Sequence, residues 1–188
     1  MIKILNKKFK PRIKARIRKN KKILSKNFDN FFGWVKGAKL VELKECNTEE
    51  DPVRPELDNK FRTGYGRKIY GVEYKGEIYA VMCFAYTNEI PKSVEELEKL
   101  STDAFLQTAM RDQTGGQIAI AYTVWSKKKG GGKLIVKEVF KKIKKSNHLN
   151  RLVTLSPLTE MATNFHERNG AKLIQINETT QNFEYKVM

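Results

Sequence analysis

The sequence predicts an α+β fold, with one central mixed, largely antiparallel sheet flanked by helices and a basic arm at the N-terminus. Two β-rich runs, residues 68–74 and 78–86, flank a short turn around Gly76 and predict a hairpin. After residue 118, strand-like and helix-like segments alternate, which indicates strands connected by helices. The separation of charge along the chain distinguishes the arm from the body. We therefore expect three parts: a basic arm, a docking segment with an acidic connector, and one folded domain, at residues 1–27, 28–59 and 60–188.

The remaining elements follow in order from local patterns. Ser93 stands three residues before Glu96, which is a capping-box pattern and predicts a short helix over residues 91–100. Residues 118–125 are rich in β-formers, and apolar residues then recur at helical spacing up to Lys145. Asn169 and Gly170 are typical of a helix C-terminus. We expect further strands at 151–155, 171–176 and 182–187, and a helix at 157–168.

Composition excludes several classes of protein. With 188 residues and 40% hydrophobic content, the chain is long enough for one ordinary core. No apolar run approaches the ~20 residues that span a bilayer, and the N-terminus has no secretory pattern. Cys46 and Cys83 are too few for a disulfide framework or a metal site, so no metal is expected. We expect a cytoplasmic protein without a transmembrane segment.

The net charge of +16 is concentrated in two segments. Residues 1–27 carry twelve lysines and arginines and no acid, and residues 127–145 carry nine lysines and one glutamate. The first segment predicts a polyanion partner such as DNA or RNA, bound by charge and without base specificity because Phe9 is its only aromatic residue. A solvated tail that keeps the protein soluble is the alternative.

A triple-glycine turn follows the strand that ends at Trp125. Glycine lets the backbone approach an anion closely, and the first amides of the following helix point outward. The turn residues Lys129, Gly130, Gly131, Gly132 and Lys133 are therefore candidates for binding a phosphate. A flexible solvated loop would have the same composition.

The segment from Thr154 to Lys172 carries the other candidate residues, Ser156 and His166. Ser156 before Pro157 is also an ordinary helix N-cap followed by an N1 proline. In that case a straight helix would separate it from His166 by about 15 Å, at 1.5 Å per residue. The two side chains can meet only if the helix begins later, near Glu160. His166 would otherwise be a surface residue at the margin of an apolar face formed by Leu158, Met161, Ala162 and Phe165, and Tyr185 in the last strand would simply be packed.

Phe165-His-Glu-Arg-Asn-Gly-Ala171 resembles a motif of the GNAT acyltransferase superfamily. In this resemblance His166 stands where the superfamily usually has the tyrosine that protonates departing CoA, and the glycine turn is similar to its pyrophosphate loop. A closer resemblance, over residues 60–188, is to the catalytic domain of malonyl-CoA decarboxylases, on Leu155-Ser-Pro157, Asn164–Leu173 and Asn182-Phe-Glu-Tyr185. It implies that Ser156, His166 and Tyr185 are catalytic and that acetyl-CoA or malonyl-CoA is the cofactor.

Three hypotheses follow for function. The first is an acyl-CoA-dependent enzyme, either decarboxylating a malonyl thioester or transferring an acyl group to nitrogen. The second is a nucleic-acid-associated modification enzyme of the same fold, in which the arm tracks phosphates. The third is a binding protein that has kept the fold and lost or altered the acyl-CoA chemistry.

Overall fold

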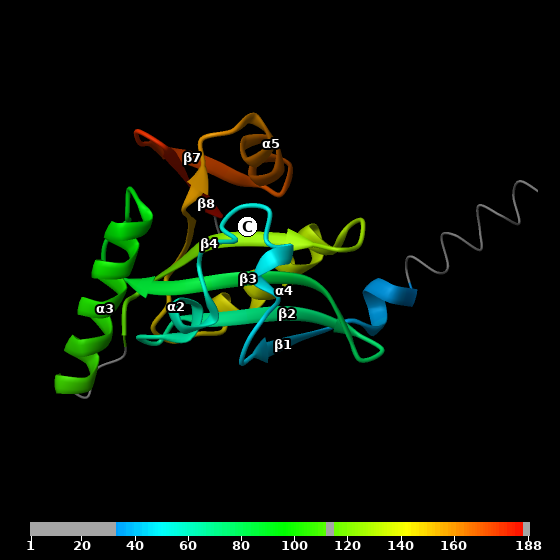
Figure 1. The fold of residues 1–188 in the computed structure, drawn as a ribbon, viewed down its shortest axis with the longest axis horizontal. Coiled ribbons are helices and arrows are strands. Elements are labelled where there is room, and N and C mark those ends of the chain that lie inside the picture. The colour runs from blue at the N-terminus through cyan, green and yellow to red at the C-terminus, as the bar shows by residue number, and fades with distance from the viewer. Residues whose placement is uncertain (1–32, 112–114, 186–188) are drawn as a thin grey trace, which may run out of the picture. The chain divides into compact units, whose positions relative to one another are not determined.

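The computed structural model describes residues 33–111 and 115–185, and the predicted basic arm lies outside these residues. The chain divides into two units, Met1–Ala38 and Lys39–Met188. In the first unit, residues 33–37 are helical. The second unit contains every strand and the remaining helices of the described chain (Figure 1). Its sheet begins at Lys39, inside the segment that we expected to be a docking segment and connector.

The predicted fold class is confirmed, because the second unit is a mixed, mostly antiparallel eight-stranded sheet with helices on both faces. The strand order is β1-β2-β3-β4-β5-β8-β6, with β7 also paired to β8. The strands are β1 (Lys39–Leu43), β2 (Lys68–Tyr74), β3 (Glu77–Thr87), β4 (Ile118–Ser126), β5 (Arg151–Thr154), β6 (Ser156–Pro157), β7 (Ala171–Ile176) and β8 (Thr180–Tyr185). The helices are η1 (Thr48–Glu50), α2 (Asn59–Thr63), α3 (Val94–Arg111), α4 (Gly131–Lys144) and α5 (Glu160–Arg168).

Two layers cover the sheet. Residues of α2 and α3, such as Phe61 and Leu97, pack against Val81 and Cys83 of β3. The α4 helix contacts the other face, where its glycine turn approaches Ala80. Because successive side chains of a strand point to opposite faces, these contacts place α4 opposite α2 and α3. The expected short helix after Ser93 is longer than predicted, and the Ser93 hydroxyl accepts from Glu96 N at 3.2 Å as a cap.

The pairing of β4 with β5 ends part-way along β4. Its register against β3 shifts after Cys83↔Thr123, so that Tyr122 is an extra, bulged residue. β4 and β5 pair in parallel from Ile118↔Arg151 to Ala121↔Thr154, and one more bond joins Leu155 N to Ala121 O at 2.9 Å. The chain then turns away, and Ser156 pairs with Gln181 of β8. The two parallel strands therefore part just beyond Ala121 and Leu155.

A buried ion pair fixes the segment before α2 to the parting strands. Asp51 accepts a hydrogen bond from Arg62 Nη2 at 2.8 Å, and both side chains are fully buried. The Thr123 hydroxyl of β4 donates to the same carboxylate at 2.9 Å. Removing one member of such a pair would leave an uncompensated charge in the core, so the arrangement holds residues 51–62 against β4.

Candidate functional site

Ser156, His166 and Tyr185 form one chain of hydrogen bonds. Ser156 Oγ lies 2.8 Å from His166 Nε2, and His166 Nδ1 lies 2.8 Å from Tyr185 Oη. The side chains come from β6, α5 and β8 respectively, and only 4–7% of each residue is exposed. The imidazole ring stacks on Phe183, with ring centroids 5.1 Å apart. The structure therefore brings together all three residues that the decarboxylase resemblance singled out.

The late start of α5 makes this contact possible. The helix begins at Glu160, and Thr159 is its N-cap, accepting a hydrogen bond from Ala162 N at 3.3 Å. The interpretation of Ser156 as the N-cap is wrong, because pairing with β8 holds Ser156 and Pro157 in extended conformation. The expected helix at 157–168 is correspondingly shorter at its N-terminus.

The orientation of α5 also differs from the expectation. Leu158 and Met161, which we placed on the core face, are 46% and 81% exposed. His166, which we placed at the margin of that face, is buried. The reason is that α5 packs against β7 and presents His166 to Tyr185 and Phe183.

Burial determines the protonation of the site. It lowers the pKa of His166 from its ordinary 6.5 to about 4, so the imidazole is neutral at neutral pH. It raises the pKa of the Tyr185 phenol well above its usual value. A neutral imidazole donates through one nitrogen and accepts through the other, so it can relay a proton between Tyr185 and Ser156. The Ser156 hydroxyl can also donate to Thr154 Oγ1, at 3.1 Å.

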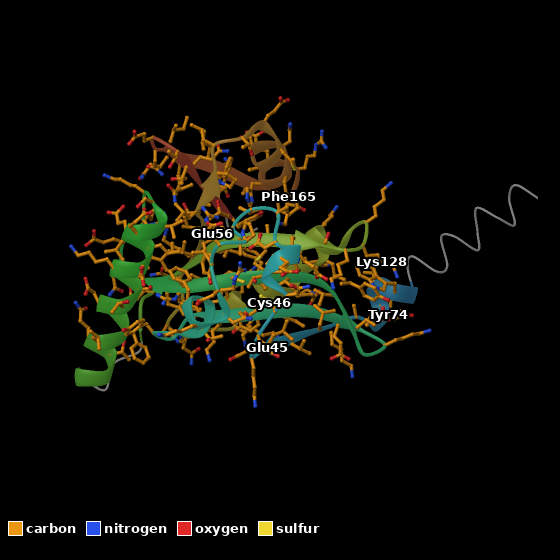
Figure 2. The ribbon with its side chains drawn as sticks, viewed as in Figure 1. Glu45, Cys46, Glu56, Tyr74, Lys128 and Phe165 are labelled. Atoms are coloured by element: carbon orange, nitrogen blue, oxygen red, sulfur yellow. The ribbon has the colours of Figure 1, made fainter. Side chains whose placement is uncertain are left out.

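The glycine turn lies next to the helix that carries His166. Gly130 is the N-cap of α4 with a positive φ of 87°, a conformation that suits glycine. A Cβ on Gly132 would stand 2.9 Å from the ring of Phe165, so this glycine allows α4 and α5 to touch. Figure 2 shows Phe165 between α5 and the sheet. Within the described residues, the amides of Gly132 and Lys133 find no hydrogen-bond acceptor, which leaves them available for an anion.

The lysines of the turn have different surroundings. Lys127 is not available as an anion ligand in this arrangement, because its Nζ pairs with Glu50 at 2.6 Å. Lys128 stacks over Tyr79 at 4.5 Å and lies close to Tyr74 (Figure 2). Lys129 and Lys133 are exposed on either side of the glycines. The side chains of these last two lysines are therefore open to solvent beside the unpaired amides.

Arg54 is a candidate that sequence reasoning missed. It is only 5% exposed, and its Nη1 donates to the carbonyl of Tyr122, the bulged residue where β4 leaves β5. Burial lowers the pKa of its guanidinium, and no carboxylate of the described chain lies within ion-pair distance of it. A buried cation without an ion-pair partner is costly, so this position suits an anionic ligand. Arg54 lies in a segment of turn residues and acids, where no sequence pattern marked it as a candidate site residue.

Metal-binding clusters and membrane spans are both absent from the described part of the chain. No group of three or more histidine, cysteine or acidic residues there could hold a metal ion. None of the helices in the same residues is long and apolar enough to cross a membrane.

Comparisons with known proteins show the fold. No family model matches the chain, and no curated protein matches it. Among solved structures, the GNAT-like decarboxylase GphF in complex with isobutyryl-CoA superposes with a TM-score of 0.59, at 10% identity over 78% of this chain and 98% of that protein. An acetyltransferase of Bacillus subtilis in complex with CoA superposes with a TM-score of 0.55, at 13% identity over 80% and 99% of the two chains. Malonyl-CoA decarboxylase from Cupriavidus metallidurans is 19% identical over 77% of this chain, with a TM-score of 0.46, and the match spans 37% of that enzyme. The first two matches show that the described part of the chain has the GNAT fold.

Proposed function

We propose that this protein is an acyl-CoA-dependent enzyme whose thioester lies where β4 and β5 part. The observation that carries the proposal is the buried Ser156–His166–Tyr185 chain of hydrogen bonds. Ser156 directly follows Leu155, where the strands part, and the helix that carries His166 touches the N-terminus of α4 through Phe165 and Gly132. The amides of Gly132 and Lys133 would bind the CoA pyrophosphate, with Lys129 and Lys133 adding positive charge. That two proteins of this fold are described as complexes with CoA or an acyl-CoA supports the same class of ligand.

Decarboxylation of a malonyl-type thioester is the reaction that these residues suit best. The bond between the α-carbon and the carboxylate breaks and CO₂ leaves. The electron pair of the broken bond stays with the α-carbon and forms a thioester enolate. One proton then adds to the α-carbon, so each turnover consumes one proton from solvent. Ser156 would deliver this proton, and His166 and Tyr185 would replace it through their hydrogen bonds.

Arg54 would balance the negative charge of the acyl group. That charge is on the carboxylate before the bond breaks and on the thioester oxygen afterwards, where a fixed cation lowers the barrier. A GNAT-type N-acyltransfer would have no acyl carboxylate, so an enzyme of that kind would leave Arg54 without this role. The buried guanidinium therefore favours decarboxylation over transfer.

A nucleic-acid role for residues 1–27 stays a prediction, because the arm lies outside the described residues. The hypothesis of a binding protein that has lost the acyl-CoA chemistry also stays a prediction. A nucleic-acid-modifying enzyme and a binding protein without the chemistry would both leave malonyl-CoA unconsumed, which distinguishes them from the proposed enzyme.

The test has two parts, both made at 0.3 M salt so that CoA phosphates do not adhere to exposed lysines. Calorimetry measures binding of free CoA, acetyl-CoA and malonyl-CoA. Mass spectrometry then follows conversion of malonyl-CoA to acetyl-CoA by the wild type and by Ser156→Ala, His166→Gln and Tyr185→Phe. We expect the rate to fall by about 10²–10⁴ in Ser156→Ala and His166→Gln.

His148→Gln is the matched control, since His148 is exposed and is the other histidine of the chain. Its rate should equal that of the wild type. CoA binding without turnover would contradict the decarboxylase while keeping the ligand class, and wild-type turnover in His166→Gln would contradict the assigned site.

A further inference from the structure

A concavity lies away from the glycine turn, over the C-terminal half of α4. Its volume is about 820 Å³, within the size range of ligand sites. It is lined by the ends of β2 and β3, by α3, and by the last turns of α4, with Lys68, Lys141, Lys142, Lys145, Tyr65 and Phe105 as its main charged and aromatic residues. We call this concavity the basic groove.

The basic groove has an excess of positive charge. Among the described residues that line the groove, Glu138 is the only acid, and it pairs with Lys141 at 2.7 Å. Lys68 pairs with Glu42 at 2.7 Å, whereas Lys142 lies over the ring of Tyr70 at 5.3 Å. Lys142 and Lys145 are therefore cations whose charge no carboxylate of the described chain neutralises at ion-pair distance. An anion is the ligand that this charge attracts.

The same groove exposes two aromatic rings. Tyr65 and Phe105 are 49% and 42% exposed, and they meet edge to face with centroids 6.2 Å apart. Gly66 lies against Phe105, because a Cβ there would stand 3.0 Å from its ring. The guanidinium of Arg67 lies 5.5 Å from the centroid of Tyr65. The rings are thus supported from the protein side and leave surface open to a flat ligand.

We propose that the basic groove binds single-stranded nucleic acid, with phosphates on the lysines of α4 and a base on Phe105 or Tyr65. Cations beside exposed aromatic rings are the combination that binds single strands, since phosphate and base each find a partner. A duplex keeps its bases stacked within the helix, so it would use the lysines and leave the rings unused. An acidic peptide would likewise contact the lysines and leave the two aromatic rings unused.

The basic groove is distinct from the proposed CoA site. α4 is 14 residues long, so its C-terminal end lies about 20 Å from the glycine turn. The groove accounts for Lys141, Lys142 and Lys145, which a pyrophosphate at Gly132 does not reach. It also places a stacking surface on the folded unit, whereas the sequence of residues 1–27 contains only one aromatic residue, Phe9.

The experiment is fluorescence anisotropy with the full chain and a labelled 12-nucleotide single-stranded RNA, at 0.1 M and 0.5 M salt. The variants are Phe105→Ala, Tyr65→Ala and the double variant Lys142→Glu/Lys145→Glu. Matched controls are Tyr74→Ala, an aromatic residue outside the groove, and Lys172→Glu, an exposed cation on β7. The arm is present in every variant, so differences between them report the groove.

We expect Phe105→Ala or Tyr65→Ala to weaken binding about fivefold or more at both salt concentrations, because stacking is insensitive to salt. The double lysine variant should weaken it mainly at 0.1 M. The controls should match the wild type, and a duplex of the same length should bind more weakly at 0.5 M. The proposal is overturned if RNA does not bind, if both aromatic variants bind like Tyr74→Ala, or if the duplex binds equally well at 0.5 M. Circular dichroism confirms that each variant is folded.

Discussion

The burial of His166 predicts a specific loss of stability in acid. Its pKa is about 4 in the folded chain and 6.5 when solvated, so between these values the unfolded chain binds the proton and the folded chain does not. The free energy of unfolding therefore falls as the pH drops through this window, and the contribution is complete above pH 6.5. At 1.36 kcal/mol per pKa unit, the loss between pH 7.5 and pH 4 is about 3 kcal/mol.

Urea unfolding of the wild type and of His166→Gln, at intervals from pH 7.5 to pH 4, measures this contribution. Acidic residues contribute to both proteins alike, so the difference between the two curves isolates His166. We expect the wild type to lose about 3 kcal/mol more than the variant over this range. His148→Gln, made at an exposed histidine, is the matched control for the replacement itself. Parallel curves for the wild type and His166→Gln would refute the reasoning, because they would mean that the imidazole is solvated or already charged.

Three further predictions concern Gly132, the buried Asp51–Arg62 ion pair and Arg54. Gly132→Ala places a Cβ 2.9 Å from Phe165, so it should lower the free energy of unfolding by about 1–3 kcal/mol and weaken CoA binding in calorimetry; Gly33→Ala, with no atom within 4 Å of the new Cβ, is the control. Arg62→Met leaves Asp51 buried without its partner and should cost about 3–5 kcal/mol in urea unfolding, part of which Asp51→Leu/Arg62→Met should restore. Arg54→Met should weaken malonyl-CoA binding about tenfold or more while free CoA binds as before, since only the acyl carboxylate is lost as a partner; equal losses for malonyl-CoA, acetyl-CoA and CoA would contradict that role.

Local patterns were sufficient to predict most of the sheet. The hairpin around Gly76 and the strands beginning at Ile118, Arg151 and Ala171 follow from runs of β-formers bounded by turn residues. The helix cap at Ser93 also followed from neighbouring residues. These features depend on contacts close in sequence, and the structure confirms them.

Features that depend on distant contacts were not predictable in the same way. Ser156 and Pro157 have the local signature of a helix start, but pairing with Thr180 and Gln181, more than twenty residues away, makes them a strand. Asp51 stands among acids and prolines and so resembles a surface turn, yet Arg62 and Thr123 bury it. Local propensity is weaker than such contacts, and a buried ion pair between distant residues leaves no periodic signal.

The pairing of β6 with β8 also explains why the side chains of Ser156 and His166 lie so close together in space. Ten residues of helix would hold the two side chains about 15 Å apart, whereas the observed Oγ–Nε2 distance is 2.8 Å. The extended residues of β6 and the turn at Thr159 reverse the chain, so that α5 runs back past Ser156 and brings His166 to it. β8 supplies both the strand that holds Ser156 and the Tyr185 that completes the hydrogen bonds. The hydrogen-bonded chain therefore depends on the pairing of β8, and disrupting that pairing at Gln181 should disable the site without touching any of its three residues.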